Sequence, residues 1–157
     1  MSLECPDDQD FVIIGATGDL TRRKLLPALY NLYLQDLLPP RGHIIGIARS
    51  PLKDEAFQDL AQQAITAFSR QPLDAARWPA FADRLRYFSL AEDGLRKARE
   101  CCSRYWRTVY LALPPGAIEG TMEGIAEAGL ATDARLVVEK PLGLDLASSR
   151  ALRATIA

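Results

Sequence analysis

Two glycines three residues apart, Gly15 and Gly18, have the spacing in this chain that most clearly suggests chemistry. They follow the apolar run from Phe11 to Ile14 and precede a helical pattern that starts at Leu20. A buried strand, a glycine turn and a helix N-terminus together bind anions, because glycine lets the backbone approach a phosphate and the first helical amides point toward it. The turn therefore predicts a site for the pyrophosphate of a dinucleotide. Its G-x-x-G spacing departs from the common G-x-G-x-x-G, so a purely structural turn is the alternative.

An arginine follows the second apolar segment, which ends at Ala48. A dinucleotide site usually has an acidic residue here, on the 2′-hydroxyl of the adenosine ribose. The sequence has Arg49 and Ser50 instead, and a planar guanidinium suits a 2′-phosphate because it donates two parallel hydrogen bonds to phosphate oxygens. We therefore expect NADP as the cofactor, with Arg49 on the 2′-phosphate and Ser50 as a further hydroxyl donor. A solvated surface arginine is the alternative.

A charged pair stands where the fifth apolar segment stops, at Glu139 and Lys140, directly before Pro141. Charge at the carboxyl edge of a central strand costs free energy unless it is paired or used. An X-Pro bond at this place can be cis, which would fix the direction of the preceding side chain. We expect Lys140 to donate to a phosphate or a sugar hydroxyl, with a strand-end salt bridge as the alternative. The fourth apolar segment stops at Pro114 and Pro115, which fix a turn and start the next helix.

Apolar segments alternate with helical ones, which predicts an α/β fold: a Rossmann-like, doubly wound parallel sheet with helices on both faces. The expected strands are Phe11–Gly15, His43–Ala48, Leu85–Leu90, Thr108–Leu113 and Arg135–Glu139. The expected helices are Leu20–Gln35, Asp54–Ser69, Ala75–Asp83, Leu95–Arg104, Ile118–Ala128 and one beginning near Asp145. Ligands of such a sheet bind outside the carboxyl ends of the strands. Beside the glycine turn, the expected cofactor contacts at these ends are Arg49, Ser50, Ala91, Glu92, Pro114, Pro115, Glu139 and Lys140.

The composition is that of a globular domain, with 48% hydrophobic and 25% charged residues among 157. The net charge of −1 argues against nucleic acid as the main partner, since there is no basic excess to neutralise phosphates. No apolar run approaches the roughly 18 residues of a membrane span, and the acidic first residues do not resemble a signal peptide. The three cysteines lack metal-ligand spacing, so we expect reduced thiols in a cytoplasmic protein and no metal site. His43, the only histidine, is expected at the amino edge of the sheet as a surface residue.

Four blocks stand in order along the chain: Gly15–Tyr30 (GATGDLTRRKLLPALY), Gly46–Ser50 (GIARS), Ala112–Pro115 (ALPP) and Glu139–Gly143 (EKPLG). With these blocks the chain resembles the glucose-6-phosphate dehydrogenase family, and its bacterial members in particular, from about Asp10 to the end. The resemblance implies an NADP-binding Rossmann-like domain over residues 10–157, after a tail of residues 1–9. It implies that Lys140 contacts both the nicotinamide end of the cofactor and the phosphate of the sugar. The residues that it places around the pyrophosphate are Gly15, Ala16, Thr17, Gly18, Asp19, Leu20, Thr21 and Arg22.

The resemblance also implies what this chain lacks. Members of the family continue into a large α+β domain, whose R-I-D-H-Y-L-G-K-E motif supplies the histidine that acts as general base on the sugar hydroxyl. That motif does not occur here, so we expect no catalytic residue in this chain and no activity of the chain alone. The intact enzyme would pass a hydride from C1 of glucose 6-phosphate to NADP, giving the lactone, in the pentose phosphate pathway. An aromatic residue that often flanks the cofactor after the two prolines is Ile118 here.

Two other functions stay open on the sequence. A sugar oxidoreductase of the Gfo/Idh/MocA type also carries E-K-P after its fifth strand, although that family tends to keep G-x-G-x-x-G. A non-catalytic nucleotide-binding module or folding remnant is the second alternative, and a lack of measurable NADP affinity would favour it. We expect the C-terminal domain as a partner. Without it, the chain should self-associate through the apolar surface that this domain would cover.

Overall fold

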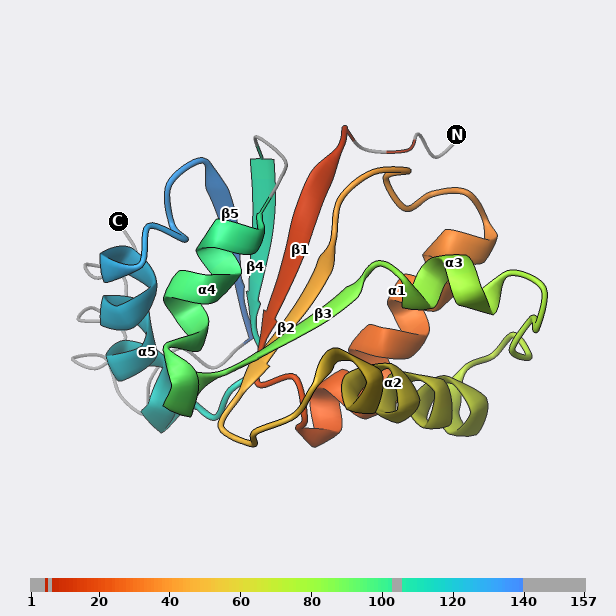
Figure 1. Cartoon of the computed structure of the whole chain (residues 1–157), viewed down its shortest axis with the longest axis horizontal. Coiled ribbons are helices and arrows are strands. Elements are labelled where there is room, and N and C mark those ends of the chain that lie inside the picture. Colours follow the sequence, from red (N-terminus) through yellow and green to blue (C-terminus); the bar gives the residue numbers. More distant parts are fainter. Residues whose placement is uncertain (1–4, 6, 103–105, 140–157) are drawn as a thin grey trace.

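A single parallel sheet forms the centre of the molecule (Figure 1). The computed structural model describes residues 5, 7–102 and 106–139. The strands lie in the order β3-β2-β1-β4-β5, and all neighbouring pairs are parallel. Their bounds are β1 (Gln9–Ile14), β2 (Ile44–Ala48), β3 (Leu85–Ser89), β4 (Trp106–Leu111) and β5 (Ala134–Val138). The predicted strands are confirmed, with ends that differ by at most two residues.

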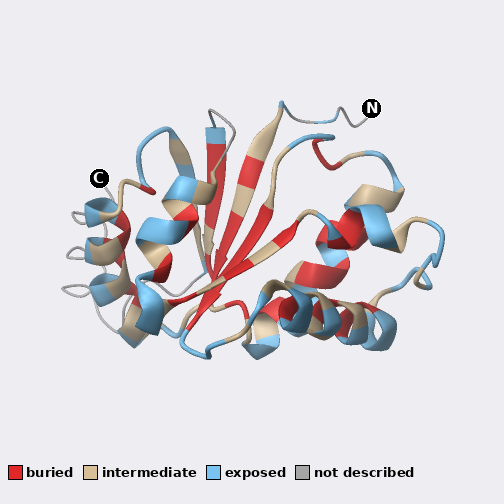
Figure 2. Cartoon of the chain, in the orientation of Figure 1, coloured by how far each residue is buried: buried red, intermediate tan, exposed pale blue. Residues whose placement is uncertain are grey.

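Helices cover both faces of this sheet, which confirms the predicted Rossmann-like α/β architecture (Figure 1). The helices are α1 (Leu26–Leu34), α2 (Asp54–Phe68), α3 (Trp78–Ala82), α4 (Gly94–Cys101) and α5 (Pro115–Glu127). Successive residues of β1 enter different cores, because strand side chains alternate between faces. Ile13 packs with α1 and α2, whereas Val12 and Ile14 pack with α4 and α5. Figure 2 shows the buried residues concentrated in the strands between these two layers of helices.

The direction in which strands are added reverses beside β1. From β1 the chain adds β2 and β3 on one side, and it then returns to add β4 and β5 on the other side. Open α/β sheets bind ligands at such a switch point, outside the carboxyl ends of the strands. The register pairs Leu111 with both Ile14 and Val138, so Gly15, Ala112 and Glu139 follow in the next row. The fold therefore gathers the predicted site residues at one edge.

The first helix differs from the predicted continuous helix Leu20–Gln35 because it begins with a wider turn. Residues Thr21–Leu25 form a π-helical turn, in which the amide of Leu26 donates to the carbonyl of Thr21. Pro27 has no amide hydrogen, and its ring would clash with the carbonyl four residues earlier in a regular α-helix. The wider turn accommodates this proline before α1 continues as a regular helix.

Two other helices start at places that local chemistry explains. α5 begins at Pro115, three residues before the predicted start, because a proline fits the first helical turn, where an amide hydrogen has no partner. α3 is shorter than the predicted helix Ala75–Asp83. The carboxylate of Asp74 accepts hydrogen bonds from the amides of residues 76 and 77, which holds that stretch as a turn.

Of the two ends of the predicted domain, only the first lies among the described residues. β1 begins at Gln9, one residue before the boundary predicted at residue 10, and the Gln9 side chain bonds with Thr108 of β4. Lys140, the bond between Lys140 and Pro141, and the helix predicted from Asp145 lie outside the described residues.

Candidate functional site

The turn after β1 can be formed only with glycine at its first position. Gly15 has φ +96°, a conformation that L side chains rarely adopt, and a Cβ there would lie 2.2 Å from the carbonyl oxygen of Ala112. Gly18 is exposed, and a Cβ there would meet only the carbonyl oxygen of Gly15, at 3.4 Å. The amide of Gly18 donates to that same oxygen, at 3.1 Å. The turn thus packs tightly against β4 on its inner side and presents bare backbone to solvent at Gly18.

Two of the predicted cofactor contacts stabilise this turn from the inside. Thr21 is fully buried, and its hydroxyl donates to the carbonyl of Gly15 at 2.9 Å. Ala16 is also fully buried, and its amide donates to the carbonyl of Ile47 in β2. Because the Thr21 hydroxyl already donates within the protein, we infer that Thr21 and Ala16 maintain the shape of the turn.

The start of the first helix lies at the same edge. The first bond of the i to i−4 type runs from the amide of Arg22 to the carbonyl of Gly18. Amides that precede this bond have no intrahelical partner and carry the positive end of the helix dipole. Gly18 and Asp19 are exposed, and Thr17 and Leu20 are half-buried. The exposed glycine turn and the helix start can therefore receive one anionic group.

The basic residues of the first helical turns lie against α2. The guanidinium of Arg23 stacks over the ring of Phe68, 5.0 Å from the ring centroid, which is a cation–π contact. Arg22 lines a hollow of about 230 Å³ whose other walls come from α2. The cation–π contact therefore accounts for the position of Arg23 by packing, without a bound anion.

The loop after β2 presents an arginine that has no side-chain partner among the described residues. Arg49 and Ser50 are exposed, and no described side chain forms an ion pair or hydrogen bond with the Arg49 guanidinium. Two side chains of β3 fix the backbone of this loop: Ser89 donates to the carbonyl of Arg49 at 3.1 Å, and Tyr87 donates to the carbonyl of Ser50 at 2.6 Å. The loop is held in place while the guanidinium stays available to a ligand.

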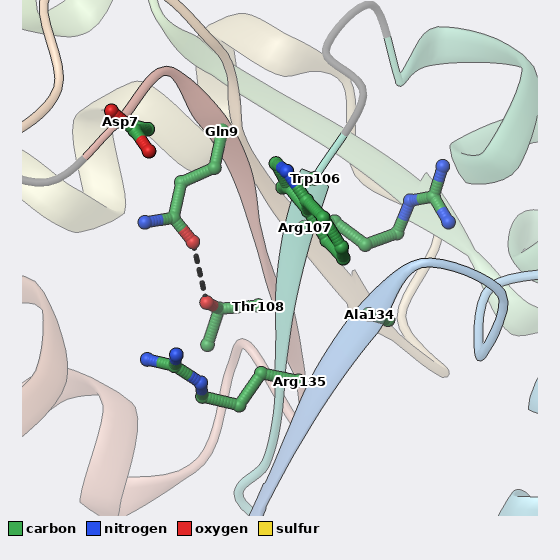
Figure 3. A pocket seen from close by; sticks show the side chains of 7 residues that line it. All are labelled: Asp7, Gln9, Trp106, Arg107, Thr108, Ala134 and Arg135. Carbon is green, nitrogen blue, oxygen red and sulfur yellow. Dashed lines mark hydrogen bonds between the residues drawn. The ribbon is translucent and has the colours of Figure 1, made fainter.

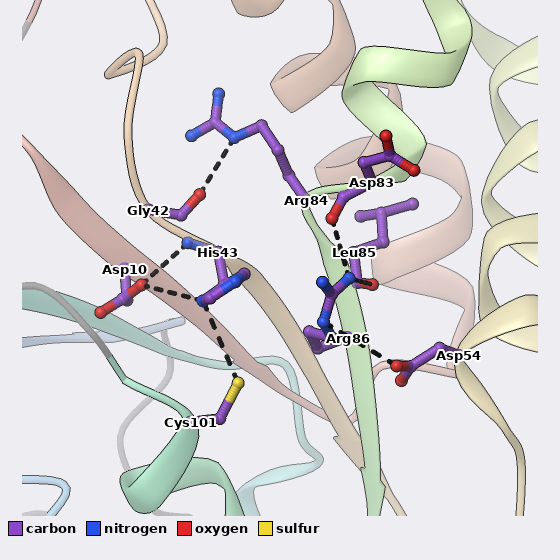
Figure 4. Close-up of polar contacts among 9 residues, drawn as sticks. All are labelled: Asp10, Gly42, His43, Asp54, Asp83, Arg84, Leu85, Arg86 and Cys101. Atoms are coloured by element: carbon purple, nitrogen blue, oxygen red, sulfur yellow. Dashed lines mark hydrogen bonds and ion pairs between the residues drawn. The ribbon is translucent and has the colours of Figure 1, made fainter.

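The first carboxylate after β2 along the chain has other partners. Asp54 accepts a hydrogen bond from the Tyr87 amide at 2.8 Å, and its other oxygen lies 3.9 Å from Nε of Arg86 (Figure 4). Both oxygens of Asp54 are thus directed toward β3.

The ends of β3 and β4 complete the edge. Ala91 and Glu92 are exposed in a short 3₁₀ turn, Leu90–Glu92. Pro114 is exposed and its carbonyl accepts the amide of Ala117, in the first turn of α5. Ile118 is 1% exposed and packs in the core between α5 and the sheet. Ile118 therefore supplies core packing, and no surface beside a cofactor.

The segment after β5 carries an unexpected polar contact. The hydroxyl of Tyr110, in β4, donates a hydrogen bond to the carboxylate of Glu139. Burial raises the pKa of Tyr110 to about 12, and the hydrogen bond and negative charge of Glu139 add to this shift. The tyrosine therefore stays protonated through the neutral range. Neither residue type in isolation predicts this pair, because it depends on the register of β4 and β5.

A hollow of about 590 Å³ lies at the opposite edge of the sheet (Figure 3). It opens at the amino ends of β1, β4 and β5, where Gln9 and Thr108 bond at 2.6 Å. Its lining includes exposed Arg135 and Trp106, which is 52% exposed. The full length of the strands separates this hollow from Gly15, so it does not belong to the candidate site.

His43 lies at the amino edge, as predicted, but it is half-buried in a polar cluster (Figure 4). Its amide donates to the carboxylate of fully buried Asp10 at 2.8 Å, and its Nδ1 lies 3.7 Å from that carboxylate. Cys101 lies 4.0 Å from the same nitrogen, and burial raises the pKa of the Cys101 thiol. The described cysteines are free, and no group of side chains in the described part of the chain could hold a metal ion.

Similar known proteins show to which family this chain belongs. The chain matches the family model "Glucose-6-phosphate dehydrogenase, NAD binding domain" over residues 12–157. It belongs to the glucose-6-phosphate dehydrogenase family. Its sequence is 39% identical to glucose-6-phosphate 1-dehydrogenase of Dickeya dadantii over 154 residues, which cover 94% of this chain and 31% of that protein.

Solved structures of the glucose-6-phosphate dehydrogenase family have the same fold. The X-ray structure of the enzyme from Mycobacterium avium superposes with a TM-score of 0.81 and 35% identity, over 95% of this chain and 34% of that one. A glucose-6-phosphate dehydrogenase in complex with glucose-6-phosphate gives a TM-score of 0.78 and 28% identity, over 100% of this chain and 35% of that one. The chain thus spans about a third of the length of these relatives.

Family membership decides between the two dehydrogenase hypotheses. It replaces the alternative of a Gfo/Idh/MocA-type domain, and the matched model names an NAD binding domain, which agrees with a glycine turn at the switch point. Among the described residues, no helix has the length and apolar character that crossing a bilayer requires.

Proposed function

We propose that this chain is the NADP-binding domain of a glucose-6-phosphate dehydrogenase. The observation that carries the proposal is the glycine turn at the switch point together with Arg49, whose guanidinium has no partner among the described residues. When bound, NADP accepts a hydride from C1 of glucose 6-phosphate, which becomes the lactone. The residues of this chain bind and orient the cofactor.

The fixed geometry supports a division of the edge into three parts. The glycine turn and the exposed helix start fit the pyrophosphate, because Gly18 offers bare backbone and the first helical amides have no intrahelical partner. Arg49 and Ser50 fit the 2′-phosphate, and the exposed turn at Ala91 and Glu92 follows β3, the strand next to β2. On the other side of β1, the expected contacts of the nicotinamide half are Pro114, Pro115, Glu139 and Lys140.

The chain alone should bind cofactor without turnover, because its only histidine lies far from the carboxyl edge where the reacting carbon would be. The reaction needs a group that takes the hydroxyl proton, and such a group contributes about 10²–10⁴ in rate. His43 lies directly before β2, and the length of this five-residue strand places it roughly 16 Å from the carboxyl edge. That exceeds the reach of a hydrogen bond, about 3 Å. In a full-length enzyme, the base, most ligands of the sugar and the surface that packs against this chain would come from the other two thirds of the protein. We expect such an enzyme in the cytoplasm.

The 2′-phosphate assignment has a direct test by calorimetry with NADP and NAD. Replacing Arg49 by Ala removes a charged hydrogen bond, worth roughly 1.5–3 kcal/mol, so NADP should bind at least about ten-fold more weakly while NAD binding barely changes. Arg135→Ala is the matched control, since Arg135 is an exposed arginine near the amino edge of β5. Equal losses for both cofactors would refute the role of Arg49. No measurable binding of either cofactor to the unaltered chain would favour a non-catalytic remnant.

A further inference from the structure

The hydroxyl of Tyr110 reaches forward along the sheet. Tyr110 pairs in register with Val137 of β5, yet its hydroxyl donates to the carboxylate of Glu139, two residues further on. Parallel strands rise about 3.3 Å per residue, so the side chain spans roughly 6.6 Å toward the carboxyl edge. Tyr110 and Glu139 share one face of the sheet, since side chains of the same parity point the same way. The contact therefore connects the carboxyl end of β4 to the segment that leaves β5.

Other tyrosines in the described part of the chain make contacts that a folded domain requires. Tyr33 donates to the carbonyl of Arg77, Tyr87 donates to the carbonyl of Ser50, and Tyr30 accepts the amide of Asp74. Each of these bonds satisfies a backbone group. Glu139, in contrast, is exposed, and water would satisfy its carboxylate without any protein donor. The bond satisfies the partly buried hydroxyl of Tyr110, but fold stability does not require that the carboxylate of Glu139 be held.

The row in which Glu139 stands links the contact to the candidate site. Gly15, Ala112 and Glu139 each follow directly after the paired residues of β1, β4 and β5. Neighbouring strands lie about 4.8 Å apart, so the backbone of Glu139 is roughly 10 Å from the glycine turn. Arg49 follows β2, on the other side of β1. A dinucleotide with its pyrophosphate at Gly15 and its 2′-phosphate at Arg49 thus extends its nicotinamide half over β4 and β5.

From this arrangement we propose that Tyr110 is a positioning residue for the nicotinamide half of the cofactor. The inference rests on the proposed function. Tyr110 holds the carboxylate of Glu139 and thereby fixes the backbone that leads, in the sequence, to Lys140. With a pKa raised to about 12, the hydroxyl remains a donor throughout the neutral range. The hydrogen bond between Tyr110 and Glu139 therefore does not act as a pH switch in this range.

The test compares two ligands that differ in the nicotinamide half. Calorimetry of this chain measures the affinity for NADP and for adenosine 2′,5′-bisphosphate, which keeps the 2′-phosphate and lacks the nicotinamide. Tyr110→Phe removes one hydroxyl and should weaken NADP about five-fold, the effect of one hydrogen bond, while bisphosphate binding stays unchanged. Tyr33→Phe is the matched control, because it removes a hydroxyl on α1 and should alter neither affinity.

A second pair of variants separates positioning from general loosening of the fold. Glu139→Ala changes an exposed residue and should give a selective loss of NADP affinity at least as large, since Glu139 is itself an expected contact of the nicotinamide half. The double variant should lose no more than Glu139→Ala alone, since that variant already removes the contact with Tyr110. Equal weakening of NADP and bisphosphate, additive losses, or unchanged NADP affinity in Tyr110→Phe would each overturn the role of Tyr110. If the unaltered chain binds neither ligand, the proposed function itself fails.

Discussion

The glycine turn allows a sharp test, because the same substitution should act oppositely at two glycines. In Gly15→Ala the new methyl would lie 2.2 Å from the carbonyl oxygen and 3.0 Å from the carbonyl carbon of Ala112, both of them backbone atoms. The residue would also keep φ +96°, which costs about 1–2 kcal/mol for an L side chain. Overpacking adds about 1–3 kcal/mol, and the strain falls on the bond from the Ala112 amide to the Ile14 carbonyl.

The expected loss of stability for Gly15→Ala is therefore about 2–5 kcal/mol. For a chain of 157 residues, that corresponds to a melting temperature roughly 5–15 °C lower. Gly120→Ala is the control: Gly120 lies within α5, and a Cβ there meets nothing within 4 Å. Alanine should stabilise that helix by about 0.5–1 kcal/mol.

Thermal and urea unfolding followed by circular dichroism measure both variants. Gly18→Ala separates stability from binding, because its Cβ makes only an ordinary contact of 3.4 Å. It should change stability by less than about 1 kcal/mol and still weaken NADP, since it fills the exposed backbone surface of the turn. A Gly15→Ala protein as stable as the unaltered chain would refute the steric argument and with it the tight packing of the turn against β4.

Four further results are expected. In the full-length protein, Lys140→Met should abolish most activity and move the melting temperature by no more than about 2 °C; a large stability loss with catalysis retained would support a salt bridge instead. An NADPH absorbance assay of this chain with glucose 6-phosphate should show no turnover, and a rate that survives His43→Ala and scales with protein concentration would contradict the missing base. Sedimentation should show self-association, against which a clean monomer at high concentration would count. Burial raises the pKa of Cys102 to about 11. Between about pH 9 and pH 11 the thiol therefore ionises in the unfolded chain but not in the folded one, so the free energy of unfolding should fall as the pH rises through this range. Cys102→Ser should flatten that part of the pH profile.

The sequence predicted the elements well because strong local signals agree with the fold. The apolar segment of β2 is buried throughout, as the pattern required, and the glycine turn follows β1 at the switch point. Pro27 was the local signal that the helical periodicity concealed. Its missing amide hydrogen explains the π-helical turn, and a proline inside a predicted helix is a warning that could have been used.

The contacts that sequence reasoning missed, within the candidate site and outside it, depend on tertiary geometry. The Thr21 hydroxyl serves the Gly15 carbonyl, and Tyr110 bonds Glu139 across two strands. Asp10 and His43, 33 residues apart, meet only because β1 and β2 pair. Periodicity gives the face on which a side chain lies, but only the register decides which neighbour it meets.

The order of the strands also has a consequence for how cofactor preference can change. Under the proposed function, the adenosine half is recognised by residues 9–92 and the nicotinamide half by residues that follow β4 and β5. The loop of Arg49 and Ser50 is fastened to β3 by backbone carbonyls, so its side chains can be exchanged without disturbing those bonds. A lineage or an engineer could convert an NADP site into an NAD site by substitutions in this one loop. The reacting end, on the far side of β1, would keep its shape.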